Sequence, residues 1–202
     1  MNYNIRLETK KDFREVENVT REAFWNVYCP GCVEHCVLHK YRDRADFVPQ
    51  LDYVIETDGR IIGHIMYAKS EIELENGKKL PIMTFGPFSV IPEYKHKGYG
   101  SILLRYTMQK AREMGVGALA ITGSFDLYGR FGFVRGKDIG VRYAFDSDAD
   151  YFLVKELEDG FLDGVKGTYK DPDGYFVSDE EAEEFDKTFP HKEKIKTDSQ
   201  IF

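Results

Sequence analysis

The residues best suited to chemistry form a glycine-rich segment in the middle of the chain. Residues 95–100 read Lys-His-Lys-Gly-Tyr-Gly and open an amphipathic run. A loop that opens a helix turns several backbone N–H groups the same way, with the positive helix end behind them. Glycines let the backbone approach an anion closely, and lysines add positive charge. We therefore predict a pyrophosphate site, and its residues are Lys95, His96, Lys97, Gly98, Tyr99, Gly100 and Ser101.

The spacing of these glycines separates the segment from two other phosphate loops. The P-loop requires Gly-x4-Gly-Lys followed by Ser or Thr, and the dinucleotide fingerprint is Gly-x-Gly-x-x-Gly. Lys95-x-x-Gly98-x-Gly100 matches neither pattern. Taken alone, the segment also fits a plain turn that only starts a helix.

A second group of reactive side chains lies nearer the N-terminus. Cys29-x2-Cys32-x3-Cys36-x2-His39 supplies four donors of the kinds that zinc binds. Structural zinc sites usually draw their ligands from two separated pairs, so small buried thiols are the simpler explanation. An odd number of cysteines without a secretory signal also argues against disulfides. We predict no metal site, with zinc at these four residues as the alternative that is not favoured.

Apolar spacing predicts the elements that must position these residues as alternating strands and helices. Asp58-Gly59 and Asn76-Gly77 are hairpin turn signals, so the middle of the chain reads as an antiparallel meander. The predicted strands of this part cover residues 3–7, 51–56, 61–74 and 79–91, and the predicted helices cover 13–27 and 34–42.

The segment after the meander predicts a crossover. A helix over 98–114 ends at Gly115, a residue suited to a left-handed cap, and a short apolar strand covers 118–122. Strands joined through a helix run parallel, so 79–91 and 118–122 should be parallel neighbours. Further strands are expected at 141–145 and 151–157, and an acidic helix with a capping box starts at Ser178. The predicted fold class is α/β (α+β), with a central mixed, mostly antiparallel sheet flanked by helices.

Composition limits the functions open to the chain. The 202 residues include 35 acidic and 28 basic side chains, so the net charge is −7, and 42% of the residues are hydrophobic. This balance is typical of a globular protein, and an acidic surface disfavours nucleic-acid binding while it suits a cationic substrate. We find neither a membrane-spanning run nor a signal peptide, so we expect a cytoplasmic protein without a membrane partner. We expect one domain over 1–202, with a core at about 3–157 and a C-terminal extension over 158–202.

The order of these segments resembles the GNAT family of N-acetyltransferases. A strand leads to Val90-x-Pro92, then Lys95-x-x-Gly98-x-Gly100, a helix, a strand and Tyr128-x-x-x-Gly132-Phe133. More closely, three motifs are similar to a bacterial and archaeal branch of that family: Gly31-Cys-Val-Glu-His35, Phe85-Gly-Pro87 and Tyr128-Gly-Arg-Phe-Gly-Phe133. Two departures stand out. Lys95 replaces the family's usual glutamine or arginine, and the asparagine often found before the tyrosine is absent, which leaves its role to Thr122, Gly123 or Ser124.

The resemblance implies the GNAT acyl-CoA N-acyltransferase fold, acetyl-CoA as co-substrate, and direct transfer to a primary amine in a ternary complex. It also implies that the backbone of Phe88, Ser89 and Val90 contacts the acetyl carbonyl and pantetheine, with the Phe88 N–H as oxyanion donor. Side chains alternate along a strand, so those of Phe88 and Val90 should share one face. Tyr128 is then the candidate general acid, because a phenol with a pKa near ~10 is protonated at neutral pH.

The general base is less sharply indicated. Glu34, His35 and His39 follow the first helix, where the family often builds the acceptor side of its cleft. Each has a side chain that accepts an amine proton directly or through water, and Glu34 is our choice. An acceptor of low pKa would need no base, and a solvated Glu-His pair is the plainer interpretation.

Three functions remain open at this point. We favour transfer to a small-molecule amine, with transfer to a protein N-terminus or lysine as the alternative. A non-catalytic acyl-CoA-binding or metal/redox-responsive sensor is the second alternative; Tyr128 favours the enzyme, and the cysteines favour the sensor. The expected partners are acetyl-CoA and an amine acceptor, with a homodimer left open. Fold-level analogy does not identify the acceptor.

Overall fold

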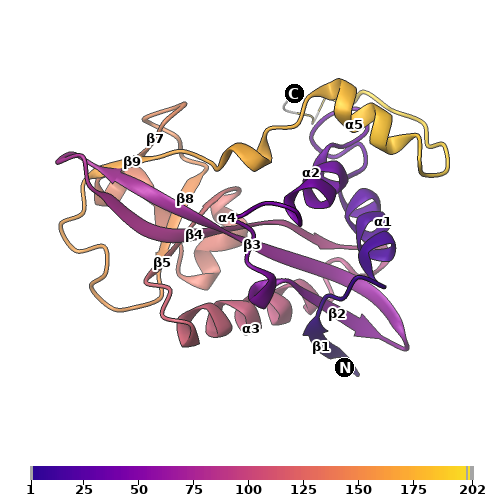
Figure 1. Cartoon of the computed structure of the whole chain (residues 1–202), viewed down its shortest axis with the longest axis horizontal. Helices are drawn as coiled ribbons and strands as arrows, with labels where there is room; N and C mark the ends of the chain where they lie inside the picture. The colour runs from indigo at the N-terminus through magenta and orange to yellow at the C-terminus, as the bar shows by residue number, and fades with distance from the viewer. Residues whose placement is uncertain (1, 199, 201–202) are drawn as a thin grey trace. The chain divides into compact units, whose positions relative to one another are not determined.

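A computed structural model describes residues 2–198 and 200 of the chain (Figure 1). The chain divides into two compact units. Unit 1 comprises Met1–Met66, Gly86–Leu104 and Asp173–Phe202, and unit 2 comprises Tyr67–Phe85 and Arg105–Pro172. The long strands β3 (Arg60–Leu74) and β4 (Lys79–Val90) and the helix α3 (Tyr99–Glu113) each contribute residues to both units. The predicted C-terminal extension is likewise divided, because its residues 158–172 belong to unit 2.

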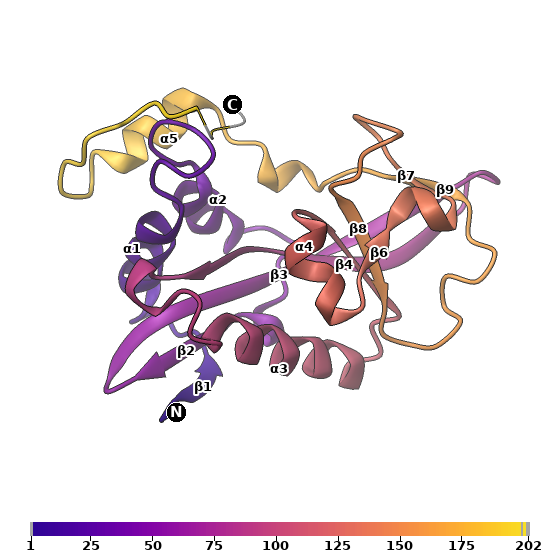
Figure 2. The same ribbon diagram turned by 180° about the vertical axis from the view of Figure 1, so that it is seen from behind.

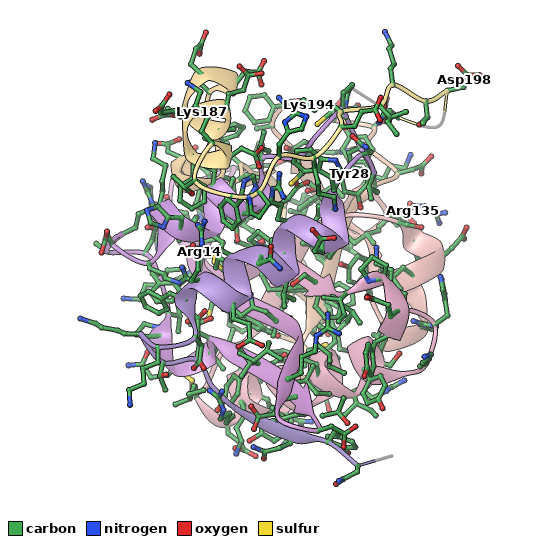
Figure 3. The ribbon with its side chains drawn as sticks, turned by 90° about the vertical axis from the view of Figure 1, so that its right-hand side faces the viewer. Arg14, Tyr28, Arg135, Lys187, Lys194 and Asp198 are labelled. Carbon is green, nitrogen blue, oxygen red and sulfur yellow. The ribbon has the colours of Figure 1, made fainter. Side chains whose placement is uncertain are left out.

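Unit 1 contains an antiparallel sheet, the helices α1, α2 and α5, and the first residues of α3. Strand β1 (Asn4–Leu7) pairs with β2 (Tyr53–Thr57), and β2 pairs with the first residues of β3. Helices α1 (Phe13–Phe24) and α2 (Glu34–Tyr41) pack against each other, and α5 (Asp179–Asp186) packs against α2, as Figures 1 and 2 both show. Arg14 of α1, labelled in Figure 3, donates to Thr188 Oγ1 at 3.0 Å, and its guanidinium lies over the Phe189 ring.

An ion pair between Arg21 of α1 and Asp186 of α5 links these two helices. Arg21 is 1% exposed and donates from Nε to Asp186 Oδ1 at 2.6 Å and from Nη2 to Asp186 Oδ2 at 3.2 Å. A buried charge is tolerated only when it is paired, and the planar guanidinium fits a carboxylate with two parallel bonds. Asp186 therefore anchors the C-terminal part of unit 1.

Unit 2 is a mixed sheet around an apolar core. Strand β5 (Ala118–Thr122) runs parallel to β4, with Met83 opposite Leu119 and Thr84 opposite Ala120. Antiparallel pairing continues from β5 to β8 (Phe152–Glu156) and from β8 to β6 (Val134–Arg135). Strand β9 (Gly167–Tyr169) pairs antiparallel with β3 and parallel with β7 (Val141–Tyr143).

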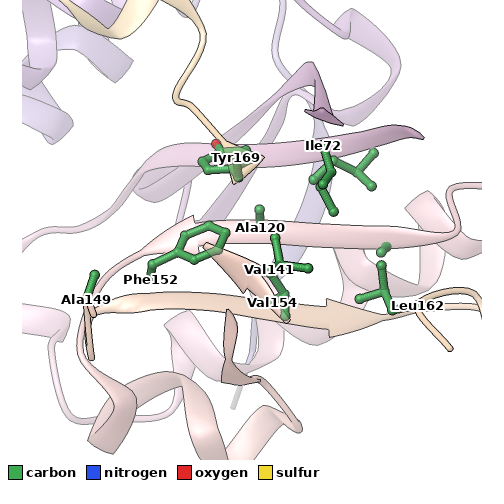
Figure 4. Close-up of a cluster of buried hydrophobic side chains, with 10 residues drawn as sticks. Ile72, Ala120, Val141, Ala149, Phe152, Val154, Leu162 and Tyr169 are labelled. Atoms are coloured by element: carbon green, nitrogen blue, oxygen red, sulfur yellow. The ribbon is translucent and has the colours of Figure 1, made fainter. Parts of the chain in front are cut away.

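The core of unit 2 follows from strand alternation. Ala118 and Ala120 of β5 and Phe152 and Val154 of β8 point to one face, in the same buried cluster as Tyr169. Figure 4 shows Ala120, Phe152, Val154 and Tyr169 of this cluster. The rings of Phe152 and Tyr169 stack with their centroids 4.9 Å apart. The small alanines leave room for the two stacked rings in the same core, and close packing requires that large and small side chains be matched in this way.

The predicted fold class is confirmed as a mixed α/β structure with a largely antiparallel sheet flanked by helices. The parallel pairing of β4 with β5, the left-handed Gly115 (φ +80°) and the capping box at Ser178 are confirmed as well. The second predicted strand begins only at Tyr53, because Pro49–Leu51 form a 3-10 turn. Among the described residues, no helix has the length and apolar character needed to cross a membrane.

Candidate active site

The predicted anion loop, in unit 1, adopts a conformation that aligns backbone donors. His96 has a φ of +60° and Gly98 a φ of +89°, so two left-handed residues occur within three positions. Backbone turns of this kind direct successive N–H groups into a concavity that binds anions. The first helical hydrogen bond of α3 runs from the Ile102 N–H to Gly98 O at 3.0 Å. The N–H groups of Tyr99 and Gly100 precede it, at the positive end of the helix.

Lysine side chains on the two sides of this loop have different partners. Lys95 Nζ donates to Ala23 O at 2.7 Å, in the last turn of α1, and burial lowers its pKa. A cation near a helix C-terminus is favourable because the last carbonyls lack helical partners. Lys97 Nζ instead lies 5.2 Å from the centre of the Tyr94 ring. The Lys95 charge that we expected at an anion therefore holds the loop against α1, and Lys97 carries the charge at the loop itself.

Phe88 and Val90 share a face, as strand alternation predicts. A Cβ placed on Gly100 would lie 3.2 Å from Phe88 Cζ and 3.4 Å from Val90 Cγ2, so both side chains pack against the first turn of α3. Ser89 points the other way, where its hydroxyl lies 3.3 Å from Thr20 Oγ1 of α1, and both residues are buried. Ser89 can therefore serve a ligand only through its backbone.

Tyr128, in unit 2, sits in an aromatic cage. It ends the short helix α4 (Phe125–Tyr128), and its ring centre lies 5.8 Å from that of Phe85 and 5.7 Å from that of Phe133. A Cβ on Gly123 would come within 2.6 Å of Tyr128 Cε2, so only glycine leaves room for the ring there. Gly132 has a φ of +85°, which turns the chain so that Phe133 returns to the cage. The Tyr-x-x-x-Gly-Phe spacing thus has a structural cause.

Tyr67 is a neighbour of this cage that the sequence did not single out. It is fully buried in β3, its ring centre lies 5.5 Å from that of Phe85, and its hydroxyl lies 3.0 Å from Thr107 Oγ1. Burial raises the pKa of Tyr67, and the charge of ionised Tyr128 adds to that rise. Because Tyr67 lies in an apolar run of the sequence, it is expected to be a core residue. No local sequence signal indicates that its buried hydroxyl has a hydrogen-bond partner far along the chain.

The three candidate bases have different surroundings. Glu34 lies in the first turn of α2, accepts a hydrogen bond from the Val33 N–H at 3.0 Å and takes part in no ion pair of the described residues. Burial raises the pKa of Glu34. His39 is exposed, with Nδ1 2.8 Å from Glu17 Oε1 and its ring stacked on Phe185.

His35 is a core residue of unit 1. It is fully buried against Phe185, with Nδ1 3.4 Å from Cys32 Sγ and Nε2 3.1 Å from Asp186 Oδ1 but without hydrogen-bond geometry to that oxygen. Burial lowers the pKa of His35 to about 4, so the ring is neutral near pH 7. Of the three candidates, Glu34 is the one carboxylate, and its pKa is raised by burial although backbone N–H groups of Val33 and Glu34 oppose that rise.

The cysteines do not converge on a common point. Cys32 Sγ lies 3.8 Å from Arg21 O, and Cys36 Sγ lies 3.8 Å from Glu181 O. Burial raises the pKa of Cys29, Cys32 and Cys36, so these thiols stay protonated and poor in reactivity. Within residues 2–198 and 200, the one set of three His, Cys, Asp or Glu donor atoms that lie within 4.8 Å of one another lies elsewhere.

That set consists of Glu8, Asp52 and His64 in unit 1; Asp52 and His64 are buried, and Glu8 is half-buried. Arg42 donates to both Glu8 oxygens, at 2.7 and 3.1 Å, and His64 Nε2 lies 2.6 Å from Asp52 Oδ1. Burial raises the pKa of Glu8 to about 7 and that of Asp52 to about 6, and it lowers that of His64 to about 4. Arg42 already hydrogen-bonds both carboxylate oxygens of Glu8. The negative charge of the cluster is therefore balanced by the Arg42 guanidinium and by a proton that the carboxyl groups retain.

Comparison with known proteins gives consistent results. Residues 4–136, more than half of the chain, match the family model described as "Acetyltransferase (GNAT) domain". The curated "Uncharacterized N-acetyltransferase YjhQ" of Escherichia coli K12 is 31% identical over 85 residues, which cover 42% of this chain and 46% of that protein. The chain thus aligns with about half the length of this relative.

Two solved structures are similar over most of the chain. The GNAT family N-acetyltransferase YhbS from Escherichia coli, in complex with CoA, has a TM-score of 0.76 at 23% identity, covering 87% of this chain and 92% of that one. A GNAT family acetyltransferase from Brucella melitensis, in complex with acetyl-CoA, has a TM-score of 0.69 at 24% identity, covering 87% of this chain and 99% of that one. At this identity the similarity speaks for a shared fold.

Proposed function

Because the chain belongs to the GNAT acetyltransferase family, we propose that it transfers an acetyl group from acetyl-CoA to a primary amine, with a small molecule as acceptor. The observation that carries the proposal is the loop of unit 1, where left-handed His96 and Gly98 lead into α3. Backbone donors at a helix start suit a pyrophosphate. Structures of two GNAT proteins of similar fold, crystallised with CoA and acetyl-CoA, support the choice of donor.

The proposed cofactor contacts use mainly backbone groups. The pyrophosphate binds the N–H groups from Lys97 to Ser101, and the Lys97 ammonium adds charge. Lys95 and His96 shape the loop, one through its bond to Ala23 O and the other through its left-handed backbone. The backbone of Val90 and Ser89 serves the pantetheine, since the Ser89 hydroxyl is buried against α1.

The proposed reaction is a direct transfer in which each proton has a destination. The amine must be neutral to attack, and Glu34 accepts its proton; burial raises the pKa of Glu34, which makes the carboxylate a stronger base. Attack on the thioester carbonyl forms the C–N bond, and the Phe88 N–H stabilises the resulting oxyanion. When the C–S bond breaks, its electron pair goes to sulfur, and Tyr128 donates its phenolic proton to the thiolate.

Two alternatives remain distinguishable from this proposal. Transfer to a protein N-terminus or lysine uses the same residues and differs only in the acceptor. A non-catalytic acyl-CoA or redox sensor is less consistent with the site, because burial raises the pKa of all three thiols and so disfavours the reactive thiolate, and because a sensor needs no proton donor such as Tyr128.

The test is thiol release from acetyl-CoA by wild type and Tyr128→Phe, across polyamines, amino acids, aminoglycosides and short peptides. We expect turnover on at least one acceptor and a loss of at least about tenfold in kcat for Tyr128→Phe, since general-acid catalysis contributes ~10²–10⁴-fold. Tyr151→Phe, which removes an exposed hydroxyl from the same unit, should retain wild-type turnover. Glu34→Gln should lower kcat/KM for the amine.

Turnover confined to the peptides would favour the protein acceptor. Tight acetyl-CoA binding without turnover on any acceptor would instead favour the sensor. Wild-type turnover by Tyr128→Phe would contradict the assignment of Tyr128 as the acid.

A further inference from the structure

A residue outside the matched family region contacts the strand that carries the proposed oxyanion donor. Tyr175 lies in the 3-10 turn η5 (Asp173–Tyr175) of unit 1, beyond residues 4–136. Its hydroxyl donates a hydrogen bond to Gly86 O at 2.9 Å. Gly86 precedes Phe88 by two residues in β4, so this bond acts directly beside the donor.

Close packing fixes the position of the Tyr175 side chain. Its ring centre lies 5.0 Å from that of Tyr41, which is fully buried and donates its own hydroxyl to Asp46 Oδ2 at 2.9 Å. Gly174 also packs closely against Tyr41 and against Arg44: a Cβ on Gly174 would lie 2.6 Å from Tyr41 Cε2 and 2.4 Å from Arg44 Nε. The turn η5 is therefore closely packed against Tyr41 and Arg44.

The strand needs a partner at this point because its backbone is irregular there. Gly86 has a φ of +128°, a conformation that other residues rarely adopt, and the next residue, Pro87, has no N–H to offer. On one side of β4, the pairing with β5 joins Met83 to Leu119 and Thr84 to Ala120, before this bend, and β3 is the neighbour of β4 on the other side. A buried carbonyl requires a hydrogen bond, and Tyr175 supplies one to the buried Gly86.

We infer that Tyr175 is a positioning residue for acetyl transfer: its hydroxyl holds the Gly86 carbonyl and thereby aims the Phe88 N–H at the acetyl carbonyl oxygen. This inference rests on the proposed function. Removing an oxyanion donor outright costs ~10²–10³-fold in kcat. Removing the Tyr175 hydroxyl keeps the Phe88 N–H but makes its orientation less well fixed. The expected decrease in kcat is therefore smaller, about three- to tenfold.

The experiment compares Tyr175→Phe with Tyr143→Phe in the full chain. Tyr143 is the matched control, since its half-buried hydroxyl also donates to one acceptor, Asp171 Oδ2, at 2.6 Å. We expect kcat to fall about three- to tenfold in Tyr175→Phe only. The dissociation constant of CoA, which lacks the acetyl carbonyl, should stay within about twofold of wild type, because an effect on the oxyanion leaves thiol binding unchanged.

A second readout does not depend on activity. In protein labelled with ¹⁵N-phenylalanine, the Phe88 amide resonance should shift in Tyr175→Phe and stay unchanged in Tyr143→Phe. An unmoved Phe88 amide would overturn the inference. So would a moved amide with wild-type kcat, or a joint loss of CoA affinity and thermal stability, which would show that Tyr175 only supports the fold. If wild type is inactive on every acceptor, the proposed function fails, and the amide shift still decides whether Tyr175 holds Phe88.

Discussion

Replacing Gly123 with alanine should move the ring of Tyr128. Gly123 follows β5, and its N–H donates to Tyr151 O at 2.7 Å, which holds its backbone in place. The added Cβ would lie 2.6 Å from Tyr128 Cε2 and 3.1 Å from Cδ2, whereas ordinary van der Waals contact begins at 3.4 Å. The ring or the backbone must therefore shift by about 1 Å to accept the methyl group.

The shift should cost activity more than stability. The rings of Phe85 and Phe133 lie 5.8 and 5.7 Å from the Tyr128 ring, centre to centre, so a displacement of that ring also disturbs their packing. Overpacking of this kind costs about 1–3 kcal/mol of unfolding free energy. A misplacement of about 1 Å costs on the order of 10²-fold in rate, so kcat should fall by about that factor if Tyr128 donates the proton.

The assay is thiol release at saturating acetyl-CoA and acceptor, with urea unfolding of each variant. Gly129→Ala is the control, because Gly129 has helical backbone angles (φ −56°, ψ −36°) and its added Cβ would meet Phe125 Cζ at 3.1 Å in the same turn. We expect Gly129→Ala to retain kcat within about twofold. A folded Gly123→Ala enzyme with the kcat of wild type would refute the link between the position of the Tyr128 ring and catalysis.

Three further predictions concern stability. Asp186→Ala should destabilise the protein by about 3–5 kcal/mol in urea unfolding, because it leaves Arg21 buried without its carboxylate partner. Adding Arg21→Met to this variant should recover much of the lost unfolding free energy. A cost below about 1 kcal/mol for Asp186→Ala would contradict the importance of the ion pair. Burial raises the pKa of Glu8 from 4.5 to about 7, so between these pH values the folded protein keeps a proton that the unfolded chain releases. The unfolding free energy of wild type minus that of Glu8→Gln should therefore fall from about pH 4.5 to 7 and then level off. A difference that stays constant with pH would argue against the shift. Ser178→Ala should cost about 0.5–2 kcal/mol, since it removes the capping bond to the Glu181 N–H, with an unchanged unfolding midpoint as the opposing result.

Local sequence signals predicted the elements of the site well. The glycines that open α3, Gly115 at its end and the capping box at Ser178 act through their own backbone or a neighbour within a few residues, so sequence alone reveals them. The two-residue β6 and three-residue β9 were missed, because strands this short show no alternation and depend on pairing with distant residues.

Sequence by itself determined which residues are available for the proposed chemistry: the loop before α3, the strand at Phe88 and the spacing from Tyr128 to Phe133. Only the tertiary structure decided what several polar side chains do, because their partners lie far along the chain. Lys95 bonds to Ala23, and Tyr175 to Gly86, across 72 and 89 positions. Such contacts depend on how elements pack, and packing brings together residues that no local pattern relates.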